Sequence, residues 1–172
     1  MGWLRRVQNR LIDSQIELEQ AIALDRNFGA AMLQLGWTLN ELGQPETALP
    51  HIEKAILLVP RNQSMYAHYA ALGQGHLLLG HTDQAVDFLR KARAANSRVY
   101  YVHLFLAAAL GLRGDVDEAK AALADMLKLK PDLNSFAKLR AASNGHYNNP
   151  QYRALAEKTE EIGLRRAGLT EE

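Results

Sequence analysis

The sequence contains no cysteine among its 172 residues, which excludes disulfide bonds and thiolate chemistry and leaves the redox compartment undetermined. It also has no excess of charge, because 20 basic residues stand against 19 acidic ones. Without a basic stripe, binding to nucleic acid or to an anionic membrane has no electrostatic support. No run approaches the roughly 18 apolar residues of a membrane span, and the N-terminus lacks the apolar core of a signal peptide. We therefore expect a cytoplasmic protein.

Histidines in a metal-binding pattern are missing as well. His68 and His76 are eight residues apart, and His81 follows, but the closely spaced pairs of a zinc site do not occur. We expect no metal site, and we expect His76 to be partly buried because it holds a packing position.

Catalytic motifs are also absent. There is no glycine-rich phosphate loop and no G-x-S-x-G. The carboxylate pairs Asp115/Asp117 and Glu160/Glu161 fall at a helix start and on a polar helix, where we expect them to favour the macrodipole or to face water. Arg165-Arg166 is interpreted as part of a solvated face rather than an anion site. The sequence thus predicts no enzyme activity and no cofactor.

What the sequence does contain is an apolar fraction of 48%, enough for a sizeable core, and an internal repeat. In the stretch 29–60, two segments of helical periodicity flank the turn Leu42-Gly43-Gln44-Pro45. Units that start at Gly29, Tyr66 and Tyr100 align with spacings of 37 and 34 residues. The longer spacing is attributed to a loop around Asn62-Gln63-Ser64. Pro60 and Pro131 close the first and third units, whereas Ser97 replaces that proline in the second.

Small residues recur at fixed places in the three units. One set lies where the two helices of a unit are expected to cross closely, a second fills the facing positions, and a third consists of glycines that end each first helix in a left-handed conformation. These sets are Gly36, Gly73 and Ala107; Ala48, Ala85 and Ala119; and Gly43, Gly80 and Gly114. Pro45 suits a first helical position, Asp115 with Glu118 predicts a capping box, and Pro50 should bend its helix.

This pattern resembles the tetratricopeptide repeat, W-x2-L-G-x2-Y followed by A-x3-F and P. It departs from that pattern at Met32, Tyr69 and His103, which stand in place of tryptophan. The resemblance implies an all-α fold, a right-handed superhelix of helix-turn-helix repeats, that is, an α-solenoid. It also implies a module for binding protein segments.

The repeat register divides the chain into three regions. A partial repeat over 1–28 contains a second helix at 16–27 and has Gly2 at the small-residue position. Either this unit is an improvised cap built on Trp3 and Leu4 or it was cut from something longer, and we favour the second interpretation. Repeats follow over 29–65, 66–99 and 100–133. Region 134–172 is expected to cap the array, with a short helix at 134–142, turn formers over 143–150 and one polar helix at 151–167 that stops at Gly168.

The concave surface of such an array is built from first helices and is the expected binding groove. Apolar and aromatic residues there would supply contact area, and polar ones would fix the register of a bound segment. Trp37 is the strongest single candidate, and packing against a neighbouring repeat or the C-terminal helix is the structural alternative for some members of the set. The predicted groove residues are Leu33, Trp37, Asn40, Glu41, Gln74, Leu77, Tyr101, Leu104, Phe105 and Ala108. This composition suits an apolar segment or helix better than an acidic C-terminal peptide.

Two other functions stay open. The tail 161–169, with HLLLG at 76–80 and HLFLAAAL at 103–110, resembles the C-terminal repeat region of bacterial class III adenylate or guanylate cyclase-type regulators and of winged-helix transcription regulators. That resemblance implies a regulatory or dimerisation role in signalling. A closed apolar pocket around Trp37 would instead favour sensing of a small ligand. Self-association through an apolar edge of the incomplete first unit is also expected.

Overall fold

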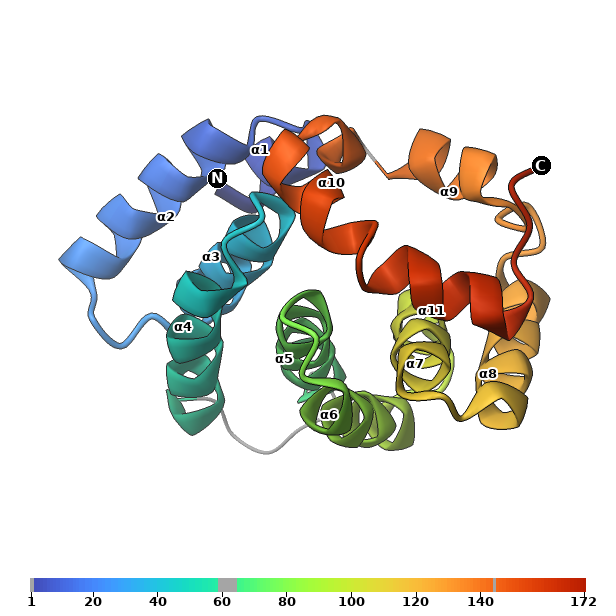
Figure 1. Cartoon of the computed structure of the whole chain (residues 1–172). Coiled ribbons are helices and arrows are strands. Elements are labelled where there is room, and N and C mark those ends of the chain that lie inside the picture. Colours follow the sequence, from blue (N-terminus) through green and yellow to red (C-terminus); the bar gives the residue numbers. More distant parts are fainter. Residues whose placement is uncertain (1, 59–64, 144) are drawn as a thin grey trace.

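The computed structural model describes residues 2–58, 65–143 and 145–172 and shows an all-helical chain. The predicted all-α solenoid is confirmed (Figure 1). Its elements are α1 (Gly2–Val7), α2 (Leu11–Leu24), α3 (Gly29–Glu41), α4 (Pro45–Leu58), α5 (Met65–Leu78), α6 (Thr82–Ala95), α7 (Tyr100–Arg113), α8 (Val116–Leu129), α9 (Phe136–Ala142), the 3-10 helix η1 (His146–Asn148), α10 (Pro150–Ala156) and α11 (Glu160–Ala167). The expectations about Pro60, about the loop at Asn62-Gln63-Ser64 and about Asn144 lie outside the described residues. None of the described helices is long and apolar enough to cross a membrane.

Helices α3 to α8 form three antiparallel pairs that stack side by side into an arch, preceded by the pair α1–α2 (Figure 1). The turns inside the three pairs are made as the sequence predicts. Gly43, Gly80 and Gly114 adopt φ values of +74°, +74° and +106°. Side chains are strained in this left-handed region, so glycine ends each first helix without steric cost.

The small residues that recur in each unit set the distance between paired helices. A Cβ added at Gly36 would overlap with the side chain of Ile52, and one added at Gly73 would lie 2.5 Å from Cγ of Leu89. Gly2 has the same relation to Leu18, with an added Cβ 2.5 Å from Cγ of that residue. Ala48, Ala85 and Ala119 are fully buried opposite the crossings. Each helix pair therefore packs through a contact that a larger residue would separate.

Pro50 lies inside α4, and the helix continues through it to Leu58. Its ring is exposed, so the carbonyl of Glu46, four residues earlier, loses a helical hydrogen bond on the side that faces water. We expect Pro50→Ala to raise the free energy of unfolding by about 1–3 kcal/mol, measured by urea denaturation. Pro150→Ala is the matched control because Pro150 is exposed but begins α10, where proline is compatible with the helix. A gain of equal size in both variants would contradict this explanation.

The capping box predicted at the start of α8 does not form. Asp115 is the N-cap residue, as expected, but its side chain makes no cap hydrogen bond. It accepts a hydrogen bond from Nε of Arg113 at 2.5 Å instead, and Glu118 pairs with Arg90 at 2.7 Å. Neighbouring arginines thus compete successfully with the backbone amides for these carboxylates.

The single polar helix expected over 151–167 is also wrong, because the chain breaks it into α10 and α11. Thr159 has φ −130° and ψ −79°, outside the helical region, and its hydroxyl donates to the carbonyl of Leu155 at 2.9 Å. The break allows Tyr152 to turn back on α11, where its hydroxyl donates to Oε2 of Glu160 at 2.8 Å. The stop at Gly168, with φ +102°, is confirmed.

Candidate functional site

The segment from α9 to α11, which we call the crossing segment, passes over the concave side of the arch (Figure 1). At one end, a Cβ added at Gly43 would lie 2.6 Å from the backbone of Gln151 and Tyr152, so the α3–α4 turn contacts the start of α10 closely. A Cβ added at Gly145 would lie 2.5 Å from Nδ2 of Asn9, which places the loop before η1 against the turn between α1 and α2. The concave side is therefore partly covered by the chain itself.

At the other end, α11 lies directly against α7. A Cβ added at Gly163 would overlap with the carbonyl of Ala108, and one added at Gly111 would overlap with the carbonyl of Gly163. Such backbone-to-backbone approach requires small residues on both helices. Arg166 adds hydrogen bonds from Nη1 to the carbonyls of Gly111 and Leu112, at 3.3 and 3.0 Å.

Four of the ten predicted groove residues make contacts inside the protein. Leu77 and Ala108 are 0% and 1% exposed and belong to a core cluster that includes Leu164 of α11. Asn40 donates from Nδ2 to the carbonyl of Ala71 at 3.0 Å and to Oε1 of Gln74 at 3.4 Å. These two amides join α3 to α5, so they stabilise the stacking of repeats. Their part in partner binding stays a prediction.

Glu41 has a partner that the sequence did not suggest. Its Oε1 accepts a hydrogen bond at 2.5 Å from Nη1 of Arg6 in α1, and the Arg6 guanidinium lies 5.8 Å from the ring centroid of Trp37. Burial raises the pKa of Glu41, and the charge and hydrogen bond of Arg6 act in the opposite direction. A cation from α1 is thus held between a carboxylate and an aromatic ring.

A cavity of about 430 Å³ remains on the concave side. Three predicted aromatic residues meet at its wall, with ring centroids of Trp37 5.8 Å from Tyr101 and 6.4 Å from Phe105. Residues of the crossing segment line its other side. The lining consists of Arg6, Val7, Asn9, Gln34, Trp37, Glu41, Tyr66, Ala67, Gln74, Tyr100, Tyr101, Phe105, Ala142, Ser143 and His146. Trp37, Glu41, Gln74, Tyr101 and Phe105 of the predicted set are therefore brought together.

A second cavity of about 100 Å³ adjoins the first, and the two share Tyr100, Tyr101, Phe105, Ala142, Ser143 and His146. Leu104 and Ala108 of the predicted set line this smaller cavity, together with Tyr147, Tyr152 and Glu160 of the crossing segment. Leu33, the remaining predicted residue, is buried in the core cluster around Trp37 and lines neither cavity.

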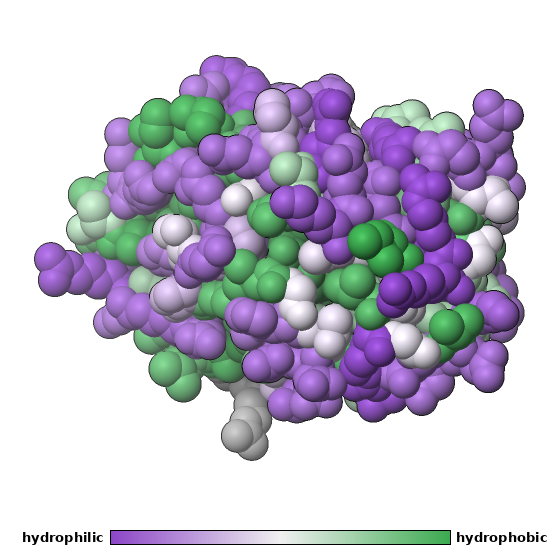
Figure 2. Space-filling view, viewed as in Figure 1, coloured by the Kyte–Doolittle hydropathy of each residue, from purple (hydrophilic) through white to green (hydrophobic). Residues whose placement is uncertain are grey.

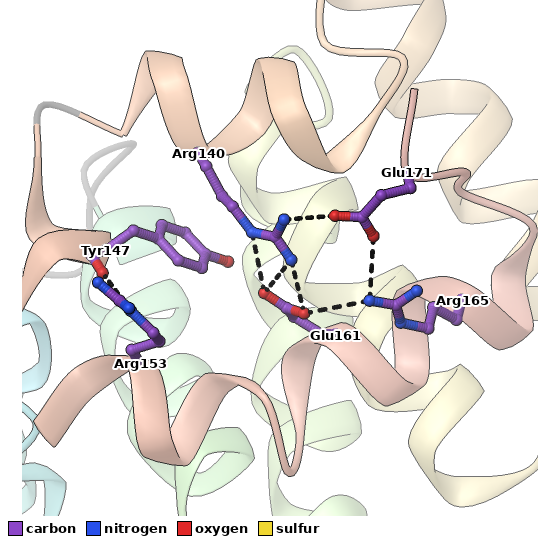
Figure 3. A network of polar contacts seen from close by, with 6 residues as sticks. All are labelled: Arg140, Tyr147, Arg153, Glu161, Arg165 and Glu171. Carbon is purple, nitrogen blue, oxygen red and sulfur yellow. Dashed lines mark hydrogen bonds and ion pairs between the residues drawn. The ribbon is translucent and has the colours of Figure 1, made fainter. Parts of the chain in front are cut away.

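Glu160 and Glu161 do not face water, contrary to the prediction, since they are 3% and 4% exposed. Glu161 accepts two hydrogen bonds of 2.9 Å from Nη2 of Arg140 in α9, and it also contacts Arg165 at 3.5 Å. Glu171 of the C-terminal tail joins the same two arginines (Figure 3). Arg165 is therefore not simply solvated. This network ties α9, α11 and the tail together.

Glu160 has the more unusual environment of the two. Burial raises its pKa to about 7, against the hydrogen bond from Tyr152, which lowers it. One oxygen, Oε2, accepts that bond, while Oε1 is buried without a hydrogen-bond partner among the described residues. The pKa of His146, which lines both cavities, is lowered to about 4 by burial and by the charge of Arg6. His146 is thus neutral at pH 7.

The raised pKa of Glu160 predicts a pH-dependent stability. Between about pH 4.5, the ordinary value, and pH 7 the folded state binds more protons at Glu160 than the unfolded state does. The contribution of this group to stability is complete below that window and is lost as the pH rises through 7. We expect Glu160→Gln to gain stability relative to the wild type as the pH increases from 5 to 8, measured by urea denaturation at each pH. Comparison with the wild type cancels the opposite contribution of His146, and a constant difference would contradict the prediction.

The histidines behave largely as packing groups. His76 is half-buried as predicted and stacks on Phe88, with ring centroids 5.5 Å apart and an interplanar angle of 4°. His103 is buried, and its Nε2 lies 2.8 Å from the carbonyl of Ser97. Among the described residues, no three His, Cys, Asp or Glu side chains are grouped so that they could hold a metal ion.

The residues that sequence reasoning missed come from the two ends of the chain. Arg6, His146, Tyr147, Tyr152 and Glu160 reach the cavities because distant segments fold onto the arch. One signal was available. Two tyrosines lie within the short run of turn formers and the helix after it, and aromatic residues in such a polar region need a packing partner.

Comparison with known proteins supports the repeat assignment. Tetratricopeptide repeat profiles match residues 17–49, 66–91 and 100–125, and the first of these matches covers the second half of α2, all of α3 and the start of α4. Among curated proteins, none matches the chain by sequence.

Several solved structures share the fold. MamA superposes with a TM-score of 0.65 at 21% identity, covering 96% of this chain and 94% of its own. A thermophilic tetratricopeptide-repeat protein of Thermus thermophilus gives 0.68 at 24% identity, covering 98% and 94%. YrrB, described as a tetratricopeptide-repeat protein with an unusual peptide-binding site, gives 0.60 at 20% identity, covering 96% and 80%. At these identities the likeness concerns the fold alone. The profile matches and the helices that they cover show that the chain contains tetratricopeptide repeats over these residues.

Proposed function

We propose that this chain is a non-enzymatic interaction module that binds a segment of another protein at the cavity between α3, α7 and the crossing segment. The observation that carries the proposal is the aromatic group Trp37, Tyr101 and Phe105 at the wall of a cavity of about 430 Å³. Aromatic side chains in such a setting supply much of the binding energy at protein interfaces. Tetratricopeptide repeats generally serve as interaction scaffolds, and one protein of this fold is described as having a peptide-binding site.

The size and lining of the cavity define what the partner inserts. The predicted open groove would hold a long segment, but Ala108 lies against α11 and Leu77 is fully buried in the same core cluster. A cavity of about 430 Å³ accommodates one or two anchor side chains, with the rest of the partner outside. Its polar groups, among them Gln34, Glu41 and Gln74, make it less apolar than the closed pocket that would favour small-ligand sensing.

Selection of peptides from a random display library on the wild-type protein tests this proposal. We expect the selected peptides to lose about tenfold or more in affinity for Tyr101→Ala, measured by fluorescence polarisation. Tyr69→Ala is the matched control, because Tyr69 is also half-buried but stacks on Phe88 away from the cavities. Melting curves of both variants verify folding. Equal affinity of Tyr101→Ala and wild type would overturn the proposal.

The resemblance to cyclase-type and winged-helix regulators stays a prediction, since the matching profiles concern tetratricopeptide repeats themselves. It would place the module beside a catalytic or DNA-binding domain. A nucleotide cyclase or winged-helix domain encoded in the same reading frame would support that role, and the interaction function described above does not depend on it.

Self-association is a separate proposal, and it rests on an exposed apolar face of α1 and α2. Trp3, Leu4, Val7, Ile12 and Ile16 are 43–59% exposed, and Figure 2 shows apolar side chains gathered over α2. Because this face is apolar and exposed, we propose that a second copy of the chain covers it. We expect sedimentation velocity to show a mass that rises with concentration, and Ile12→Glu with Ile16→Glu to abolish the rise. Leu24→Glu, on the same helix but beyond this face, should leave it unchanged, and a wild type that stays monomeric would contradict the proposal.

A further inference from the structure

Glu160 is a buried carboxylate that lacks a counter-ion. It is 3% exposed, and it forms no ion pair with the other described residues, whereas its neighbour Glu161 has two arginines. The Tyr152 hydroxyl donates to Oε2, and hydrogen bonds from Gln74 and Tyr147 also act on this carboxylate, whereas Oε1 has no hydrogen-bond partner among the described residues. When this carboxyl group is ionised, its unpaired buried oxygen is costly, and a cation at Oε1 would offset that cost.

The surroundings of Glu160 suit a cation on an apolar stem. Aromatic residues Tyr101, Phe105 and Tyr147 line the cavity of about 100 Å³ on which Glu160 borders, and the faces of aromatic rings attract cations. Leu104 and Leu139 line it too and offer apolar contact for methylene groups. The small volume fits a compact ammonium group better than the planar fork of a guanidinium.

The route to Glu160 runs through the larger cavity. The shared lining of the two cavities makes them neighbours, and the larger one extends to Val7 and Asn9, which are exposed at the turn between α1 and α2. At its outer end, Arg6 already lies between Glu41 and Trp37, which shows that this lining holds a cation. Arg6 thereby compensates the charge of Glu41, whereas Glu160 has no counter-ion among the described residues. His146, neutral at pH 7, does not compete for Glu160 as a cation.

We propose that Glu160 and the rings around it bind a primary ammonium group on an unbranched aliphatic stem. The source is a lysine side chain of the partner segment or a free alkylamine. The lysine form deepens the proposed function and rests on it, because it names the anchor residue that the partner inserts. The ammonium donates to Oε1 of Glu160, and its stem lies along Tyr101 and Phe105 toward the turn between α1 and α2.

The test uses the full chain, with n-butylamine and Nα-acetyl-lysine-N-methylamide as probes and n-butanol as the uncharged control. Titrations followed by ¹H–¹⁵N NMR are expected to show both amines binding, with shifts at Tyr101 and Glu160, and butanol binding more weakly. Glu160→Gln keeps the size of the side chain and an acceptor for Tyr152 but removes the charge, and it should weaken amine binding by about tenfold or more. Glu118→Gln, on α8 outside both cavities, should change nothing.

Equal affinity of wild type and Glu160→Gln, equal binding of butanol and butylamine, or no amine binding by the wild type would each overturn the site. Binding of butylamine alone supports the site and assigns it to free amines. The peptides selected on the wild type separate this inference from the proposed function. Peptides that need Tyr101 but tolerate norleucine in place of lysine would overturn the lysine anchor and leave the interaction function standing. If the wild type bound amines but no selected peptide depended on Tyr101, the interaction function would be overturned and the amine site would stand.

Discussion

Gly163→Ala is expected to lower the free energy of unfolding by about 3 kcal/mol or more. An added Cβ would overlap with the carbonyl of Ala108 in α7, and that contact is with backbone, which cannot move aside as a flexible side chain can. Helix α11 must therefore move away from α7. This displacement separates Leu164 and Ala167 from the core cluster that they share with Leu106.

Urea denaturation measures this loss, and limited proteolysis shows whether the C-terminal segment is released first. Ile162→Ala is the matched control, because Ile162 is the adjacent residue of the same helix but is exposed. We expect that variant to lose less than about 1 kcal/mol. Comparable stability of Gly163→Ala and the wild type would show that α11 is not fixed by this crossing.

Tyr152→Ala should have the second large effect, a loss of about 3–5 kcal/mol. Tyr152 is 1% exposed and is the largest side chain in the cluster with Leu78 and Ala156, so its removal leaves a cavity where α10 contacts the arch. The edge-on contacts of its ring with His146 and Tyr147, at 4.8 and 5.2 Å between centroids, would be lost as well. Thermal and urea denaturation report the loss.

Tyr152→Phe isolates the hydroxyl from the ring. This variant keeps the packing and removes only the hydrogen bond to Glu160, so we expect a smaller loss of about 1–2 kcal/mol. The same change should raise the pKa of Glu160 further, because the Tyr152 hydrogen bond lowers it in the wild type. If Phe and Ala proved equally destabilising, the ring packing would not be the main contribution of Tyr152.

The repeat array could be predicted from the sequence because each of its determinants is local. Gly36 and Ile52 contact each other within one helix pair, and Gly43 needs only its own backbone geometry. These relations recur with a period near the repeat length, so each unit confirms the next. Even Gly2 could be placed in register from the later units, and its approach to Leu18 agrees.

The crossing segment could not be predicted because its contacts are distant in sequence and occur once. The helix with Glu160, Glu161, Arg165 and Arg166 is rich in charge, which indicates exposure when no partner is known. Its burial depends on Gly163 meeting Gly111 and on Arg140 reaching Glu161 from α9. The expected groove residues were chosen by their position in the repeat, and how far each is covered depends on this segment.

The contacts at the two ends of the crossing segment also have a mechanical consequence. A stack of helix pairs without such contacts is flexible, because each repeat contacts only its neighbours and small rotations between repeats add up along its length. Here the approach of Gly43 to Tyr152 and that of Gly111 to Gly163 join the first complete repeat to the last. By connecting these two repeats, the crossing segment is expected to restrict changes in the curvature of the array. A partner that requires a less curved array must first break one of these two contacts.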